Sequence, residues 1–156
     1  MNFTIQPIEN PQKKSELTVQ LLSNLPQWFG SPESVKEYAQ GVKEHPFYAA
    51  FDKGVCIGFF SGKIHYNRTG EIYVCAVDHK YHYQGIGKSL YDMMEKYFKK
   101  QKCIYVVVKT LSDIVDYEPY KSTHRFYKSV GFTELITLTE MWDEENPCLI
   151  MIKSIG

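Results

Sequence analysis

The feature that most constrains this chain is a strand, a glycine-containing turn, a long amphipathic segment and a second strand, which follow one another between residues 70 and 109. The first strand is predicted over Gly70–Val77 (GEIYVCAV). Apolar residues such as Ile86 and Leu90 then recur at helical spacing. Cys103–Lys109 (CIYVVVK) is almost continuously apolar, which favours a strand covered on both faces. A unit of this kind predicts two parallel neighbouring strands joined by a right-handed crossover.

The remaining segments predict the other elements of an α+β fold. Helices are expected where a capping residue or a proline precedes a helical apolar stripe, and strands where apolar residues alternate or run together. The further predicted helices are a segment from Pro11 to before Pro26, Ser31–Gly41 and Ser122–Val130. The further predicted strands are Phe3–Ile8, a hairpin around Asp52-Lys53-Gly54, Thr133–Leu138 and Leu149–Ile155. We expect one domain over residues 1–156, with a mixed sheet of six to seven strands and about four helices.

Composition excludes several function classes. The 156 residues are 44% hydrophobic, and 18 basic residues balance 18 acidic ones, so no overall field attracts nucleic acid or an anionic membrane. No signal peptide is recognisable, and no apolar stretch approaches the roughly 18 residues of a membrane span. The four cysteines lie far apart, three of them in apolar runs, which predicts buried free thiols. We expect a cytoplasmic protein that binds neither nucleic acid nor membrane.

The turn before the amphipathic helix has a composition that suits an anion. Gly85 and Gly87 let a ligand approach the backbone, and the first amides of the following helix lack partners within the helix. No carboxylate occurs between Asp78 and Asp92, whereas histidines and lysines do. The segment His82–Ser89 therefore predicts a phosphate or pyrophosphate site.

Two common nucleotide-binding templates fail at this turn. Gly87-Lys88-Ser89 matches the end of a phosphate-binding P-loop, but His82 occupies the position of the leading glycine. A dinucleotide fingerprint that begins at Gly85 would need its third glycine where Leu90 stands. Neither template therefore describes the turn.

Two short patterns resemble those of the GNAT acetyltransferase superfamily. The acetyl-CoA loop of that family reads Gln/Arg-x-x-Gly-x-Gly/Ala, and His82–Gly87 (HYQGIG) occupies it. The family's signature Phe-Tyr-x-x-x-Gly-Phe is matched by Phe126–Phe132, one predicted strand further along. The element order of the whole chain is also similar, so the resemblance implies a GNAT-like acyl-CoA N-acyltransferase fold. Two residues depart from the pattern: His82 replaces the usual Gln or Arg, and Tyr120 stands where many members have Asn.

The resemblance implies that acetyl-CoA is the cosubstrate. The two parallel strands would splay at their C-terminal ends, so that the pantetheine arm enters between them and bonds to backbone groups including those of Val77. The amides of residues 83–88 would hold the pyrophosphate. The implied cofactor-binding residues are Val77, His82, Tyr83, Gln84, Gly85, Ile86, Gly87, Lys88 and Ser89.

Acetyl transfer to an amine needs a base, and Glu71 is the leading candidate. The family commonly transfers the group directly in a ternary complex, and well-studied members carry a glutamate base at a position that Glu71 matches, six residues before Val77. Alternation along a strand places Glu71 and Tyr73 on the face of Val77. A solvated glutamate at the start of a strand is the structural alternative, and Tyr73 and His124 remain substitute bases.

The predicted acid is Tyr127, which matches the tyrosine that the family places near the CoA sulfur. A phenol with an ordinary pKa of about 10 is able to protonate the departing thiolate. The structural alternative is a packed helix tyrosine beside Phe126, a residue that we expect in the core.

The acceptor amine is the part of the reaction that the residues determine least. In this family the acceptor pocket is usually built by the first two helices and their connection, which implies Trp28 and Phe29, with Tyr73 close by. The loop between the last two strands, predicted at Glu140–Pro147, adds carboxylates and Trp142, which could supply a cation–π wall; a solvated acidic turn is the alternative. Small amines, amino-acid derivatives, aminoglycosides and protein N-termini or lysines all stay open.

Other functions are less well supported. His79 and His82, with Cys75 nearby, lack a well-placed third ligand, so no metal is predicted. A catalytically silent acyl-CoA sensor is the main alternative, whereas an ATP-dependent phosphotransferase is disfavoured by His82. The fold often pairs through its C-terminal strands, which allows a homodimer.

Overall fold

The computed structural model describes residues 2–156, which form two compact units. Unit 1 holds the chain up to Lys63 together with Tyr73–Tyr97, and unit 2 holds Ile64–Ile72 together with Phe98–Gly156. Hydrogen-bonded strands follow the order β1-β2-β3-β4-β5-β7-β6. The expected α+β class is confirmed, since residues 2–156 contain a mixed sheet of seven strands and four α-helices. The single-domain boundary stays a prediction.

Unit 1 begins with a short edge strand and two capped helices. Its elements are β1 (Thr4–Pro7), α1 (Pro11–Ser23), α2 (Pro32–Gly41), β2 (Phe47–Asp52), most of β3 (Val55–His65), the end of β4 (Thr69–Val77) and most of α3 (Ile86–Lys100). Asn10 caps α1 by accepting a hydrogen bond from the Lys13 amide at 2.9 Å, and Ser31 occupies the cap of α2 as predicted. β1 pairs antiparallel with β2, and β2 with β3.

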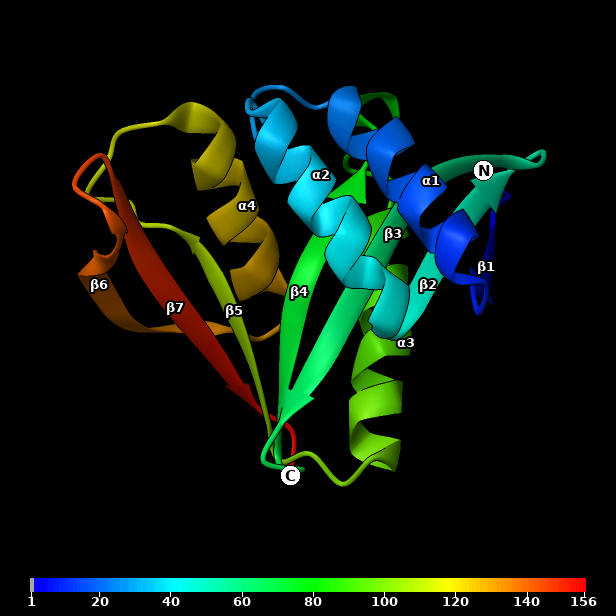
Figure 1. The fold of residues 1–156 in the computed structure, drawn as a ribbon. Coiled ribbons are helices and arrows are strands. Elements are labelled where there is room, and N and C mark those ends of the chain that lie inside the picture. Colours follow the sequence, from blue (N-terminus) through cyan, green and yellow to red (C-terminus); the bar gives the residue numbers. More distant parts are fainter. Residues whose placement is uncertain (1) are drawn as a thin grey trace. The chain divides into compact units, whose positions relative to one another are not determined.

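The core of unit 1 lies on both faces of its strands. One apolar cluster joins α1, α2 and the strands, and comprises Leu17, Leu21, Leu22, Leu25, Val35, Val42, Phe47, Ala49, Cys56, Phe59, Val74 and Ala76. On the opposite face α3 packs closely, because a β-carbon at Gly58 would lie 3.2 Å from Leu90 and the Phe60 and Tyr91 rings are 6.3 Å apart. Figure 1 shows α1 and α2 side by side in front of β2 and β3, with α3 behind them.

The β2–β3 hairpin has the turn that its sequence predicts. Lys53 and Gly54 both have positive φ, 50° and 82°, the conformation of a tight two-residue hairpin turn. The register shifts between Ala50 and Phe51, where β2 carries an irregularity. The turn fixes which residues of the hairpin face the helices.

Unit 2 is built on the predicted parallel pair. Its elements are the start of β4, β5 (Tyr105–Leu111), α4 (Glu118–Ser129), β6 (Thr133–Asp143) and β7 (Asn146–Ser154). Thr69–Ile72 of β4 pairs parallel with Tyr105–Val108 of β5, which confirms that prediction. β7 pairs antiparallel with both β5 and β6.

The expectation that β5 is covered on both faces is wrong. Burial alternates along the strand: Val106 and Val108 are buried, whereas Tyr105 and Lys109 are exposed. The apolar run is continuous because Val107 is also apolar, but that side chain is only half-buried. One face of β5 therefore stays accessible.

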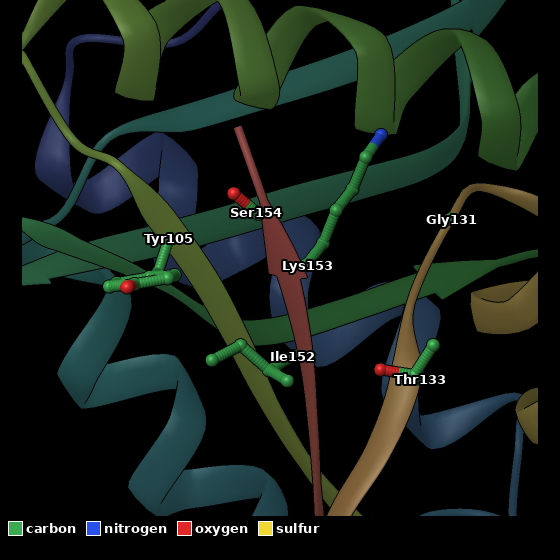
Figure 2. A pocket seen from close by; sticks show the side chains of 6 residues that line it. All are labelled: Tyr105, Gly131, Thr133, Ile152, Lys153 and Ser154. Atoms are coloured by element: carbon green, nitrogen blue, oxygen red, sulfur yellow. The ribbon is translucent and has the colours of Figure 1, made fainter. Parts of the chain in front are cut away.

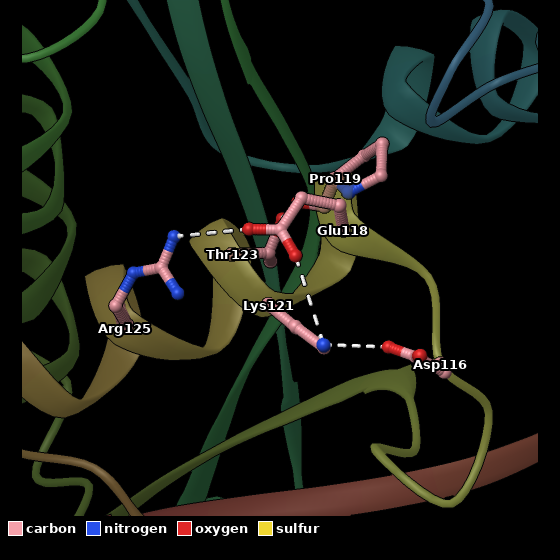
Figure 3. Close-up of polar contacts among 6 residues, drawn as sticks. All are labelled: Asp116, Glu118, Pro119, Lys121, Thr123 and Arg125. Carbon is pink, nitrogen blue, oxygen red and sulfur yellow. Dashed lines mark hydrogen bonds and ion pairs between the residues drawn. The ribbon is translucent and has the colours of Figure 1, made fainter.

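α4 begins at Glu118 and not at Ser122 as predicted. Ion pairs surround its first turns (Figure 3): the Lys121 ammonium lies 2.5 Å from Asp116 and 3.6 Å from Glu118, and Arg125 lies 3.9 Å from Glu118. The hydrogen bond from Lys121 lowers the pKa of Asp116. These groups are largely exposed, so the pairs add little stability.

The prediction of a loop over Glu140–Pro147 is also wrong. β6 continues to Asp143 and β7 starts at Asn146, so only two residues connect them. The Asp143 carboxylate accepts hydrogen bonds from the amides of Glu145 and Asn146 at 3.0 and 2.9 Å, which stabilises this turn. An aspartate in this position favours a short turn where acidic composition had indicated a longer loop.

All four cysteines are free thiols, as predicted, but Cys75 is only half-buried. Burial raises the pKa of Cys56 to about 11, so that thiol is protonated at neutral pH. Among residues 2–156, no helix has the length and apolar character that crossing a membrane requires.

Gly70 is a position in unit 2 where a side chain would collide with the core. A β-carbon there would lie 2.6 Å from the buried Phe98 ring. We expect Gly70→Ala to lower the free energy of unfolding by about 1–3 kcal/mol, measured by denaturant titration. A smaller loss is expected in a Phe98→Leu background, because the smaller side chain relieves the contact. An equal loss in both backgrounds would contradict this explanation.

Candidate functional site

The turn between β4 and α3 lies wholly within unit 1. β4 ends at Val77, and the Asp78 amide donates to the Ile57 carbonyl at 2.8 Å. A short 3₁₀ helix over His79–Tyr81 follows, and then Tyr83 and Gly85 both adopt positive φ, 63° and 82°. The chain then enters α3, which begins at Ile86.

The turn is open on the side where a ligand would approach. A β-carbon at Gly85 would have no other atom within 4 Å, and Tyr83 is 90% exposed. The Ser89 amide makes the first helical hydrogen bond, to the Gly85 carbonyl at 3.1 Å. The amides of residues 86–88 precede that bond and lack acceptors within the helix. The backbone therefore has the shape of an anion site.

Two carboxylates from outside residues 79–91 reach this turn. The Tyr81 hydroxyl donates to Asp52, from the end of β2, at 3.1 Å, and this hydrogen bond raises the pKa of Tyr81. Lys88 lies 3.1 Å from Asp92, one helical turn later. Asp52 was missed because it is 29 residues away in sequence.

His82 points back toward β4. Its Nε2 lies 2.7 Å from the carbonyl oxygen of Val77, so the structure brings two predicted cofactor-binding residues together. The imidazole also contacts Trp28, at 5.8 Å between ring centres, and His79, at 5.1 Å. Trp28, predicted to line the acceptor pocket, therefore packs against the turn.

The other predicted acceptor residues of unit 1 belong to a second aromatic group. Phe29 contacts Tyr38 at 6.0 Å, and Tyr38 contacts Tyr73 at 5.4 Å. Tyr73 also contacts His45 at 5.2 Å, and the Lys63 ammonium lies 4.9 Å from the centre of the Tyr73 ring. Sequence reasoning missed Tyr38, although its place on the partly apolar face of α2 was a usable signal.

Glu71, in unit 2, is a buried and paired carboxylate. It is 5% exposed, so the alternative of a solvated glutamate is wrong. His65 Nε2 lies 2.7 Å from Oε1, and Lys109 Nζ lies 3.7 Å from Oε2. The side chains of His65 and Lys109 are 43% and 38% exposed, so both partners of the buried carboxylate also contact solvent. Neither partner was identified from the sequence.

Tyr127 and His124 lie on the buried stripe of α4. The Tyr127 ring contacts Phe126 at 5.5 Å and Phe132 at 5.6 Å. Phe126, expected in the core, is only half-buried, because the buried stripe runs through His124, Tyr127 and Val130. His124 Nε2 lies 2.6 Å from the Leu111 carbonyl and therefore donates to it, which removes that nitrogen as a base.

Trp142 lies on β6 of unit 2 and is 46% exposed. It thus belongs to a different unit from Trp28, Phe29 and Tyr73.

Two pockets, one in each unit, are lined by residues other than the predicted site residues. In unit 2, a pocket of about 400 Å³ is lined by Tyr105, Gly131, Thr133, Ile152, Lys153 and Ser154 (Figure 2). In unit 1, a pocket of about 230 Å³ surrounds Lys14, which donates to the His45 carbonyl at 2.6 Å. Burial lowers the pKa of Lys14. Within residues 2–156, no group of three or more potential metal ligands is found.

Solved structures with the same fold include several acetyltransferases. A GNAT-family acetyltransferase from Desulfovibrio desulfuricans has a TM-score of 0.85 and 16% identity, over 99% of this chain and 100% of that one. The ribosomal-protein-S18-alanine N-acetyltransferase of Escherichia coli has a TM-score of 0.78 and 17% identity, over 99% and 95%. A GNAT-family acetyltransferase from Elizabethkingia anophelis with acetyl-CoA bound has a TM-score of 0.75 and 19% identity, over 99% of each chain.

Sequence comparison adds a family match. No curated protein matches the chain. The model of the acetyltransferase (GNAT) family matches residues 15–132, a span that includes His82–Gly87 and Phe126–Phe132. Because this match covers well over half of the residues, the chain belongs to the acetyltransferase (GNAT) family.

Proposed function

We propose that the chain is an acetyl-CoA-dependent N-acetyltransferase that moves the acetyl group to a primary amine by direct transfer in a ternary complex. The observation that carries this proposal is the turn between β4 and α3. Gly85 is open at positive φ, and the turn leads at once into a 15-residue helix. Helix amide donors and the positive end of the helix dipole then favour a diphosphate.

The residues of this turn fit the diphosphate of CoA. Amides of residues 83–88 would bind its oxygens, and Lys88 and the Ser89 hydroxyl would add side-chain donors. Gln84 is turned toward the chain, since its side-chain amide donates to the Lys80 carbonyl at 3.2 Å. The backbone at Val77 would receive the pantetheine arm.

The chemistry is assigned to Glu71 and Tyr127. Glu71 takes a proton from the acceptor ammonium, and the free amine attacks the thioester carbonyl. Tyr127 then gives its proton to the CoA thiolate as the carbon–sulfur bond breaks, and the second proton that the attacking nitrogen loses restores the Tyr127 phenol. The alternative of a silent sensor would make the buried Glu71, paired with His65 and Lys109, a structural residue.

The acceptor is a primary amine that contacts Trp28, Phe29, Tyr73 or Trp142. Small amines, amino-acid derivatives, aminoglycosides and peptide N-termini are the classes to compare. The four free thiols support a reducing, cytoplasmic location for the reaction.

Gly85 allows a direct test of CoA binding. Alanine there resists a φ of 82°, so we expect Gly85→Ala to displace the turn amides and weaken CoA binding at least about tenfold, measured by calorimetry. Gly54→Ala is the matched control, since Gly54 has the same φ and equally open surroundings in the β2–β3 turn. Equal CoA affinities in the two variants would contradict the proposed site.

Glu71→Gln tests the proposed base. With any amine that releases free CoA thiol from acetyl-CoA, we expect kcat to fall by about 10²–10⁴-fold. CoA affinity should stay the same, because Glu71 is not among the residues assigned to the diphosphate. An unchanged kcat would show that another group is the base. CoA binding by the native chain without turnover on any amine class would favour the sensor.

Tyr127→Phe tests the proposed acid. The variant keeps the ring contacts with Phe126 and Phe132, so the melting temperature should change little. We expect kcat to fall by at least about tenfold, because the thiolate loses its proton donor. Phe126→Leu, which alters packing but removes no hydroxyl, is the control. Equal kcat in Tyr127→Phe and the native chain would leave Tyr127 a packing residue.

A further inference from the structure

The hydrogen bond between His82 and Val77 fixes the state of the imidazole. A carbonyl oxygen only accepts, so the Nε2 that lies 2.7 Å from the Val77 oxygen must carry the hydrogen. The bond is short and partly buried, and burial strengthens a hydrogen bond relative to one in water. Nε2 is therefore committed to the strand and is not available to an anion at the turn.

Neighbouring rings hold the imidazole in this orientation. The Trp28 ring meets His82 edge-on at 5.8 Å, and His79 does so at 5.1 Å. Trp28 comes from the connection between α1 and α2, which is anchored by its amide donating to the Leu25 carbonyl at 3.1 Å. His82 thus sits between this connection and the end of β4.

The hydrogen bond that the Val77 carbonyl accepts from His82 can be replaced by one from another donor. The next amide, of Asp78, lies just beyond β4 and donates to the Ile57 carbonyl of β3 at 2.8 Å. The bond to the Val77 carbonyl comes instead from a side chain. A side chain can rotate away without breaking this backbone bond, so another amide donor could take its place.

We propose that His82 competes with the pantetheine arm of CoA for the carbonyl of Val77. This inference rests on the proposed binding of acetyl-CoA. Pantetheine carries two secondary amides, whose N–H groups match a carbonyl at the end of a strand. A carbonyl can accept two hydrogen bonds, but the imidazole, held by Trp28 and His79, covers one approach to it. Binding of the arm then exchanges the Nε2–H donor for a pantetheine N–H, and the exchange lowers the affinity for CoA.

Two variants and two ligands separate this competition from other roles of His82. His82→Phe keeps a ring beside Trp28 but cannot donate, whereas His82→Gln keeps an amide donor at similar reach. Adenosine 3′,5′-bisphosphate shares the nucleotide end of CoA but lacks pantetheine. We expect His82→Phe to bind CoA roughly three- to tenfold more tightly than the native chain, the effect of one net hydrogen bond. Binding of the bisphosphate should be equal in both, and His82→Gln should match the native chain with either ligand.

A spectroscopic measurement on the native chain gives a second readout that does not depend on variants folding. With ¹⁵N-labelled histidine, the Nε2–H signal of His82 reports its hydrogen bond to the carbonyl. CoA should shift this signal to that of a solvated imidazole, while the bisphosphate should leave it in place. This measurement decides the question if His82→Phe does not fold.

The outcomes that overturn the proposal are distinct from failure of the proposed function. If the native chain does not bind CoA, the proposed function itself fails. If CoA binds but His82→Phe binds it no more tightly, or the His82 signal is the same with and without CoA, the competition is refuted. A parallel loss of CoA and bisphosphate affinity in His82→Phe would also refute it and make His82 a phosphate contact.

Discussion

The turn from β4 into α3 depends on two backbone conformations that ordinary side chains resist. Tyr83 holds a φ of 63°, which costs a non-glycine residue about 1–2 kcal/mol, and Gly85 holds 82° at little cost. Together they let the chain pass from the C-terminal end of β4 to the N-terminal end of α3 within a short turn. The strand carbonyl is satisfied by His82, whereas the helix amides are left open. This asymmetry is the reason why we propose a negatively charged ligand for the turn.

Unit 2 is organised around a different constraint, a carboxylate that is almost fully buried. An isolated charge in that position would be costly, so Glu71 requires partners. His65, at the end of β3, and Lys109, on β5, supply them from two different strands. The 3.7 Å separation from Lys109 is too long for a direct hydrogen bond. The carboxylate is therefore held mainly by the contact with His65 at 2.7 Å.

Local patterns in the sequence predict the elements, and long-range contacts account for what they miss. The Ser31 cap, the turn at Lys53-Gly54 and the stripe of α3 are set by residues a few positions apart, and all were found. His65, Lys109 and Asp52 meet their partners only through strand pairing and the tertiary fold, so nothing local identifies them. For β5 the local pattern predicted too much burial. Apolar residues on both faces indicated a fully covered strand, but burial depends on which elements cover each face, and one face of β5 is accessible. Of the candidate site, the backbone of the turn was predictable and the side-chain partners were not.

In the loop His82–Gly87, Gly85 and the first residue, His82, meet different physical requirements. Gly85 is constrained by φ and by the space a ligand needs, so the pattern at that position predicts backbone geometry. The first position carries a side chain whose length and donors decide what it reaches. A long, flexible arginine can extend away from the strand, whereas the short, rigid imidazole of His82 bonds to a carbonyl five residues before it. A chain can therefore keep the loop of its family while its first side chain acts on the strand instead of on the ligand.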